Sequence, residues 1–377
     1  MHKISFCRTC LESNLRPNSY FSKTNQCLAC NYSESFKDEN RLQKLEHLKH
    51  LIKNKKKISR AKHHFDCIVG ISGGKDSTRQ AHWVKERLGL NPLLVCCSYP
   101  PLQMNEIGAK NLSNLISMGF DIFCLTPAPK TSAKLSLESF IKFGNICKST
   151  EMALFSTVPR VAIEFGINIV FWGENPALQI GDSAVQGEDE FDGSNLRELN
   201  TLREGGYDWM ASQASKSQME HYVYPEKDLF TRKKISIFYL GPAWEDFTLH
   251  DNSIYASIQG LTLRPDEEFI TGDLSNASAL DEEFTNINYM IRYFKFGIGR
   301  VADYLSQKIR DGSITRNEAV KLAETYDGIC DDSIIQDYCK YVNISNNIFW
   351  STVNQYVNKD LFIIKGNKRP VKNFSFN

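Results

Sequence analysis

The residues best suited to chemistry form one short run, Ser72-Gly73-Gly74-Lys75-Asp76-Ser77. An apolar, β-branched segment over 65–71 precedes the run and predicts a buried strand, and a helix-compatible segment follows over 76–88. Glycine lets backbone N–H groups approach a phosphate, and the helix N-terminus adds the positive end of its dipole. The lysine supplies a positive charge and the serines supply hydroxyls. The run therefore predicts an anion-binding loop, with a plain Gly-Gly turn as the alternative.

The spacing of this loop differs from that of a Walker A loop, which needs G-x-x-x-x-G-K-[ST]. A lysine directly after Gly-Gly and before Asp-Ser resembles the PP-loop of the N-type ATP pyrophosphatases. That resemblance implies that ATP is cleaved between its α- and β-phosphates and that AMP is transferred to a substrate oxygen. It also implies that the loop holds the departing pyrophosphate.

Four cysteines near the N-terminus form a second candidate site. Their spacing is C-x2-C, a sixteen-residue gap, and C-x2-C, at Cys7, Cys10, Cys27 and Cys30. Four thiolates favour a tetrahedral, structural Zn²⁺ site with no open position for catalysis. We expect a zinc ribbon with a short β-ribbon between the pairs, in which the metal supplies folding energy that so small a core lacks. Four cysteines without a metal are the alternative.

Composition limits the classes of protein to which this chain can belong. The 377 residues are 42% hydrophobic and 24% charged, which is typical of one large globular domain with appendages or of two domains. Lys+Arg (45) nearly balances Asp+Glu (44), so the chain lacks the positive surplus of a dedicated nucleic-acid binder. We find neither a membrane-length apolar run nor a signal peptide. We therefore expect a cytoplasmic protein with no membrane partner, whose cysteines are thiols or metal ligands.

Strands and helices alternate after the loop. Further strands are predicted over 91–98, 120–125, 167–172 and 235–240, and helices over 105–118 and 131–165. This alternation predicts an α/β fold with a doubly wound, mostly parallel sheet, an N-terminal four-cysteine zinc ribbon and a helical C-terminal region. The expected organisation is a zinc ribbon over 1–35, a helical and basic linker over 36–62, a nucleotide-binding core over 63–240 with a polar insertion after about 180, and a mainly helical substrate or partner region over 241–377.

Ligands in such sheets bind at the carboxyl ends of the strands, which places a second segment, Gly173-Glu174-Asn175, on the same rim as the loop. Its carboxylate is suited to holding Mg²⁺, orienting an amide or deprotonating a nucleophile, although a turn before Pro176 is an equal alternative. The glycine-rich stretch after residue 180 is interpreted as a lid over this rim, and 241–285 as irregular chain.

Two cations near glycines in the C-terminal region, Lys295 and Arg300, are candidates for binding an anionic substrate. Cations on the surface of a helix are the alternative. Further along, Thr315 and Glu318 have the spacing of a capping box at a helix N-terminus.

Taken together, these stretches resemble the N-acetyl sugar amidotransferases, PP-loop enzymes of O-antigen and flagellin-sugar biosynthesis. The resemblance spans nearly the whole chain and rests on the two cysteine pairs, Cys67–Thr78, Leu88–Leu93, Trp172–Pro176, Tyr293–Arg300, Ile309–Ala319 and Tyr326–Gly328. One departure is Val301-Ala302-Asp303, where the family pattern leads us to expect a Thr-Asp element.

The resemblance implies that an acetamido oxygen of an N-acetylated sugar, either a nucleotide sugar or a nonulosonic acid, attacks the α-phosphate of Mg-ATP. Ammonia then displaces AMP and leaves an acetamidino group. The implied cofactors are ATP, Mg²⁺ and structural Zn²⁺. The implied roles are nucleotide binding by Ser72, Gly73, Gly74, Lys75, Asp76, Ser77 and Gly173, catalysis by Lys75, Asp76, Glu174 and Asn175, and sugar binding by Lys295 and Arg300.

The ammonia source is expected outside this chain. Residue 2 is histidine, so no N-terminal cysteine nucleophile is present, and no Gly-x-Cys-x-Gly elbow occurs. A separate glutaminase subunit or free ammonia would supply the nitrogen.

Two alternatives stay open. A tRNA-thiolating PP-loop enzyme would share the four-cysteine ribbon, but the core cysteines Cys67, Cys96, Cys97, Cys124 and Cys147 form no C-x-x-C pair, and the neutral charge disfavours tRNA. A non-catalytic nucleotide-binding module is the other alternative.

Overall fold

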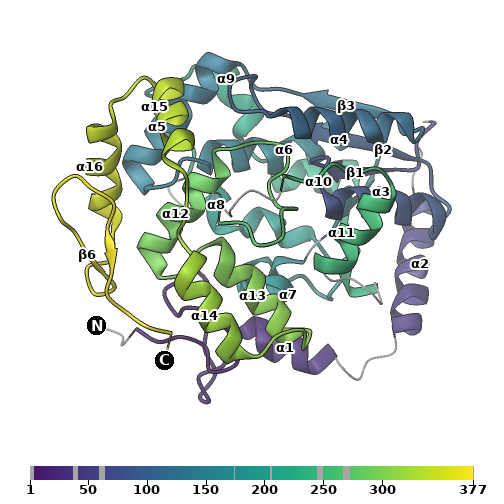
Figure 1. The fold of residues 1–377 in the computed structure, drawn as a ribbon. Helices are drawn as coiled ribbons and strands as arrows, with labels where there is room; N and C mark the ends of the chain where they lie inside the picture. Colours follow the sequence, from purple (N-terminus) through teal and green to yellow (C-terminus); the bar gives the residue numbers. More distant parts are fainter. Residues whose placement is uncertain are drawn as a thin grey trace.

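A single parallel sheet organises the chain (Figure 1). The computed structural model describes residues 4–36, 41–58, 64–173, 175–203, 206–243, 249–265 and 272–376. Within these ranges, five strands pair in the order β3-β2-β1-β4-β5, every pair parallel. Their bounds are β1 Cys67–Ile71, β2 Pro92–Cys97, β3 Ile122–Leu125, β4 Ile169–Trp172 and β5 Ser236–Tyr239. The doubly wound α/β fold and all five predicted strands are confirmed.

Helices cover both faces of the sheet because successive strand residues point to opposite sides. Ile68 and Val170 pack with α5 (Pro129–Phe143) and α6 (Lys148–Phe165) on one face. Val69 and Phe171 pack on the other face with α2 (Arg41–Ile58), α3 (Lys75–Glu86) and α4 (Glu106–Ser117). The segment expected to be a helical and basic linker forms α2, whose Leu48 and Ile52 are buried in the core.

Three local expectations need correction. The helix predicted over 131–165 is two helices, because Gly144 adopts φ +57° and ends α5. The stretch 241–285, expected to be irregular, contains α11 (Leu249–Ile258), which packs on α3.

The third correction concerns the predicted lid. The segment after residue 180 consists of short helical turns, and its Val185, Leu196 and Met210 are buried in the same hydrophobic cluster as α6. Those turns are η1 Ser183–Val185, η2 Ser194–Glu198, α8 Asn200–Arg203, η3 Asp208–Met210, α9 Lys216–Met219, η4 Glu220–Tyr222 and α10 Lys227–Lys233; α7 Pro176–Gln179 precedes them, and η5 Gly241–Ala243 follows β5. The segment is therefore a packed part of the core.

The C-terminal region is helical, as expected. Its elements are α12 Thr285–Phe296, α13 Arg300–Arg310, α14 Arg316–Tyr326, α15 Asp332–Val342 and α16 Asn346–Tyr356, followed by the short antiparallel pair β6 Phe362–Ile363 and β7 Val371–Lys372. Helices α12, α15 and α16 share a hydrophobic cluster with Phe140 of α5, which joins the region to the sheet domain. The predicted capping box of Thr315 and Glu318 is confirmed at the start of α14.

The N-terminal module, residues 4–36, lies beside α13 and α14 at the lower edge of Figure 1. The expected β-ribbon is reduced to isolated bridges, Phe6 with Ser13 and Phe21 with Cys27, and α1 (Leu28–Phe36) follows. The Phe6 ring packs on Phe374 and Phe376, with centroids 5.5 and 4.9 Å apart. Chain segments from both ends therefore meet on one side of the molecule. Across the described ranges, no helix combines the length and the apolar character needed to cross a membrane.

Gly108 of α4 provides a test of how the C-terminal region docks on the sheet domain. A Cβ at this position would lie 2.6 Å from the Asp281 Cα, a backbone atom that cannot move aside cheaply. Helix propensity alone would make Gly108→Ala stabilising by about 1 kcal/mol. We expect instead a loss of about 1–3 kcal/mol in the free energy of unfolding, measured by urea denaturation, because the helix would be overpacked. The neighbouring exposed Ala109→Gly should show the ordinary propensity loss of about 1 kcal/mol; a stabilised Gly108→Ala would contradict the docking geometry.

Candidate functional site

The glycine loop has the geometry that its sequence predicts. It follows β1 directly, Gly73 adopts φ +83°, and Gly74 is the N-cap of α3. The Ser72 Oγ accepts a hydrogen bond from the Gly74 N–H at 3.4 Å, and the Ser77 hydroxyl donates to the Gly74 carbonyl at 3.1 Å. The first bond of α3 runs from the Thr78 N–H to the Gly74 carbonyl, so the N–H groups of the preceding turn lie ahead of the helical ladder. The loop is thus a preformed backbone cradle for an anion.

Lys75 and Asp76 form a fixed pair in this loop. The Lys75 ammonium lies 2.7 Å from the Asp76 Oδ2, and the Asn252 amide donates to the Asp76 Oδ1 at 2.6 Å. Asn252 is fully buried on α11, and its Oδ1 accepts from Arg79 at 2.8 Å. No local motif marks Asn252, because its partner lies 176 residues away in the sequence.

A pocket of about 400 Å³ joins the loop to the C-terminal helices. The residues that line it come from the N-terminal module, the loop, the end of α7, the segment before α12, and α12 and α13. They are Arg16, Ser72, Gly74, Lys75, Asp76, Gln179, Ile180, Ala277, Ser278, Ala279, Leu280, Asp281, Tyr289, Arg292, Arg300, Asp303, Tyr304 and Gln307. This volume lies within the range of small-molecule binding sites.

Arg300 contributes a buried positive charge to this pocket. Its side chain is 6% exposed, and none of its three guanidinium nitrogens has a hydrogen-bond partner among the residues that the structure describes. The guanidinium carbon lies 4.5 Å from the centre of the Tyr289 ring. Asp327 accepts from the N–H groups of Gly299 at 2.8 Å and Val301 at 3.0 Å, and so holds the start of α13 in place. Buried polar groups are normally paired, so this arrangement indicates a site for an anionic ligand.

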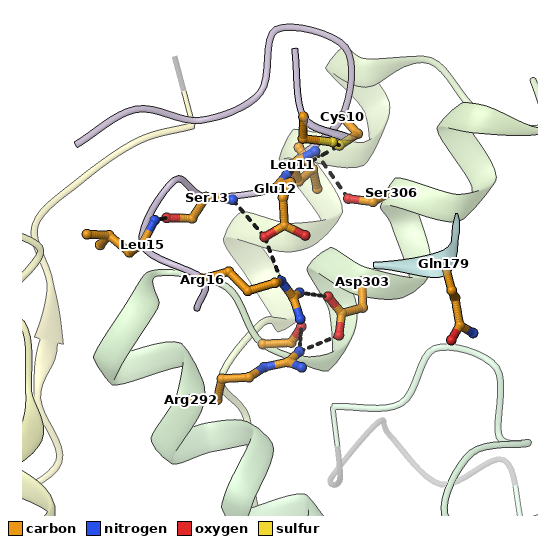
Figure 2. Close-up of polar contacts among 12 residues, drawn as sticks. Cys10, Leu11, Glu12, Ser13, Leu15, Arg16, Gln179, Arg292, Asp303 and Ser306 are labelled. Atoms are coloured by element: carbon orange, nitrogen blue, oxygen red, sulfur yellow. Dashed lines mark hydrogen bonds and ion pairs between the residues drawn. The ribbon is translucent and has the colours of Figure 1, made fainter. Parts of the chain in front are cut away.

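Two further arginines line the same pocket. Arg292 of α12 donates to Asp303 at 2.5 Å and to the Gly299 carbonyl at 2.6 Å. Arg16, from the N-terminal module, forms an ion pair with the same Asp303 (Figure 2). The sequence analysis identified neither arginine, since no local motif marks them.

Lys295 and Asn175 lie outside the pocket lining. The Lys295 ammonium donates to the Phe143 carbonyl at 2.8 Å and lies near the rings of Phe296 and Tyr356. The Asn175 side chain caps α7 by accepting from the Ala177 N–H, and its amide donates to the Glu190 carbonyl.

The other two residues of the predicted rim segment 173–175 give less information about binding. Gly173 faces α3, where a Cβ would lie 1.4 Å from the Gln80 Nε2, so a larger residue at this position would displace the Gln80 side chain. Glu174 lies outside the described residues.

The four predicted cysteines are brought together as expected. Their sulfur atoms all lie within 4.8 Å of one another and are buried. The Cys7 and Cys30 sulfurs are 4.0 Å apart, and those of Cys10 and Cys27 are 3.6 Å apart. The N–H groups of Thr9, Glu12 and Cys27 donate to cysteine sulfurs at 3.3–3.4 Å, as backbone N–H groups do around metal-bound thiolates. The cluster fits one metal ion.

One part of the chain matches a known protein family. Residues 269–372 match the family described as "LPS biosynthesis protein WbpG-like, C-terminal domain". The matched segment holds Tyr289, Arg292, Arg300 and Asp303 of the pocket. A search of curated proteins gave no match.

Among solved structures, the chain is similar to NMN synthetase from Francisella tularensis, with 15% identity, coverage of 61% of this chain and 100% of that one, and a TM-score of 0.30. It is also similar to the U34-tRNA thiolase NcsA from Methanococcus maripaludis with its [4Fe-4S] cluster, with 16% identity, coverage of 91% and 96%, and a TM-score of 0.31. Likenesses at these TM-scores carry no conclusion about the activity of this chain.

Asp281, at the pocket wall, generates a pH prediction. Burial, and then the neighbouring Glu282, raise its pKa from 3.8 to about 7. The folded chain therefore keeps a proton that the unfolded chain releases above about pH 4, so this residue lowers stability as the pH rises from about 4 to about 7. The free energy of unfolding of the parent chain should fall over that range. We expect the fall to be about 1–3 kcal/mol smaller in Asp281→Asn, measured by urea denaturation. The exposed Asp360→Asn should follow the parent curve, and identical curves for Asp281→Asn and the parent would contradict the prediction.

Proposed function

We propose that this protein is an ATP-dependent, AMP-forming amidotransferase that converts the acetamido group of an N-acetylated sugar into an acetamidino group. The observation that carries the proposal is one pocket lined by both the glycine loop and Arg300, whose guanidinium has no hydrogen-bond partner among the described residues. A phosphate-binding loop and a second anion site in one cavity suit a reaction between ATP and an acidic second substrate. The match of residues 269–372 to an LPS biosynthesis family supports a sugar as that substrate.

The chemistry proceeds in two steps. The acetamido oxygen attacks the α-phosphorus of ATP, the bond to the bridging oxygen breaks, and pyrophosphate leaves with that electron pair. Ammonia then adds to the adenylated imidate carbon, the C–O bond breaks, and AMP leaves with the oxygen. The loop N–H groups and Lys75 would stabilise the charge that grows on the pyrophosphate.

Asp76 would hold Mg²⁺, which neutralises phosphate charge when bound. Lys75 and Asn252 already fix the orientation of this carboxylate. Glu174 and Asn175 stay candidates for orienting the imidate or the ammonia, which would come from a separate glutaminase or from solution. The sequence interpretation paired Lys295 with Arg300 as the sugar's anion site; the pocket favours Arg300, with Arg292 beside it.

For the four-cysteine cluster we propose structural Zn²⁺. A tetrahedral Zn–S distance of about 2.3 Å places ligand sulfurs about 3.8 Å apart. The observed separations of 3.6 and 4.0 Å agree with a single ion. An iron–sulfur cube would hold its thiolates at four separate corners, and therefore further apart.

A tRNA-thiolating enzyme is the second candidate, and one observation favours it. Cys96 and Cys124 face each other across β2 and β3, a pairing that the lack of a C-x-x-C motif concealed. Cys124 is exposed, and its hydrogen bond with Cys96 is the main cause that lowers its pKa to about 6. AMP release that depends on tRNA and needs no sugar would favour this candidate.

The loop can be tested through Lys75. With Mg-ATP, ammonium and a panel of N-acetylated nucleotide sugars and nonulosonic acids, the parent chain should release AMP and pyrophosphate only with the correct sugar. Lys75→Ala should lower kcat by about 10²–10³-fold, because the pyrophosphate loses a preorganised positive charge. The exposed Lys85→Ala on the same helix serves as the control. Mass spectrometry should show oxygen replaced by NH in the sugar; sugar-independent AMP release, or an unaffected Lys75→Ala, would contradict the proposal.

Arg300 can be tested through the affinity for the sugar. Arg300→Gln should raise the sugar KM by about tenfold or more, since a buried charge-assisted contact is lost, while the ATP KM changes little. Lys321→Gln, an exposed cation on α14, is the matched control. We expect Lys295→Gln to affect the sugar KM less than Arg300→Gln. A larger increase in the sugar KM for Lys295→Gln than for Arg300→Gln would indicate that Lys295 binds the anionic group instead.

A further inference from the structure

The four-cysteine module is fixed to the helix that forms one wall of the pocket. The Leu11 N–H donates to the Ser306 Oγ of α13 at 3.2 Å, and the Leu11 side chain is fully buried against Val301 and Leu305. Arg316 of α14 donates to the Cys10 carbonyl at 3.2 Å. The backbone that leaves the second metal-ligand position is therefore seated on α13 and α14.

The same segment brings Arg16 into the pocket (Figure 2). The Arg16 Nε lies 2.8 Å from the Glu12 Oε1, and the N–H of Glu12 donates to the Cys10 Sγ at 3.4 Å. The Arg16 side chain is 9% exposed. The position of Arg16 thus depends on the turn that begins at Cys10, and this turn connects the cysteine cluster to the pocket.

Asp303 links Arg16 to the other arginines of the pocket. It forms ion pairs with Arg16 and with Arg292, at opposite carboxylate oxygens. Desolvation would raise its pKa, but these two guanidinium groups outweigh that effect and lower it. The guanidinium carbons of Arg292 and Arg300 lie 4.7 and 4.5 Å from the centre of the Tyr289 ring. A displaced Arg16 would therefore disturb Asp303 and, through it, the two arginines that lie against the Tyr289 ring.

The ion pairs among these residues determine which positive charge is available to an anionic ligand. Glu12 and Asp303 pair with Arg16 and Arg292, which leaves Arg300 as the cation with no partner among the described residues. Without Arg16, the Oδ1 of Asp303 would lose its partner, and this half of the carboxylate would compete with an anionic ligand for Arg300. Arg16 thus keeps a carboxylate occupied that would otherwise oppose binding.

We propose that the four-cysteine module is a working part of the substrate pocket: Arg16 is a positioning residue that holds Asp303 and Arg292 in place, and metal loading thereby sets the affinity for the anionic substrate. The effect on substrate rests on the function proposed above. The physical coupling between the cluster and α13 does not depend on it.

Hydrogen exchange tests the coupling without any substrate. The full chain is compared after zinc loading and after zinc removal with a chelator, with zinc content measured by elemental analysis. Metal removal should speed exchange at least about tenfold in peptides covering α13 and leave α3 unchanged, because local opening follows the loss of supporting contacts. Unchanged exchange in α13 would overturn the proposal.

Variants at residue 16 test the effect on binding while the metal stays in place. Zinc-loaded Arg16→Ala should raise the sugar KM about tenfold and leave kcat and the ATP KM within about twofold. Arg16→Lys should restore part of the affinity, since it keeps the charge and loses the fork between Glu12 and Asp303. Arg8→Ala is the matched control, because Arg8 lies in the same module and is exposed.

The two experiments separate the possible failures. If no sugar supports AMP release by the parent chain, the proposed function fails, and hydrogen exchange still decides whether the cluster supports α13. If the sugar reaction is present and Arg16→Ala keeps the parent KM, the positioning role of Arg16 is overturned. A lower kcat together with a higher KM for both substrates would indicate a general folding defect. That result would overturn the positioning role of Arg16 as well.

Discussion

A guanidinium group buried without a partner is a strong constraint on the surrounding protein, because removing a charge from water without compensation is costly. Arg300 has no hydrogen-bond partner among the residues that the structure describes, and several neighbouring features hold it in place. The Tyr289 ring lies close to its guanidinium, Asp327 secures the helix end from which it projects, and Asp303 is kept in place by two other arginines. The pocket therefore suits a negatively charged ligand. The glycine loop lines the same pocket, and its backbone N–H groups also suit an anion.

Local patterns predicted much of the fold. Each strand is a short apolar run bounded by turn residues, so all five were identified, and the glycine loop and cysteine pairs are contiguous motifs. Errors occurred where a local signal was weak. Gly144 divides a long helical stretch through a left-handed conformation, and α11 has little amphipathic pattern because it contacts its neighbours with a mixture of polar and apolar residues.

The candidate site was predicted only in part, and the reason is distance along the chain. The loop is complete within six residues, whereas the ion pair of Arg16 and Asp303 joins positions 287 residues apart. Asn252 reaches Asp76 across 176 residues. Arginine side chains usually face solvent, so nothing in the sequence distinguishes Arg16 or Arg292 from exposed cations. Arg300 was selected for its glycine neighbours, and Lys295, selected with it, proved to face the Phe143 carbonyl.

The packing of Phe6 on Phe374 and Phe376 has a consequence for biosynthesis. Domains usually fold as they emerge, N-terminal parts first. Here the cysteine module is synthesised before its neighbours on α13, α14 and the aromatic tail. Its contacts with them can form only after those later segments have emerged. A nascent chain would therefore complete its glycine loop before it completes the pocket that the loop shares with α13.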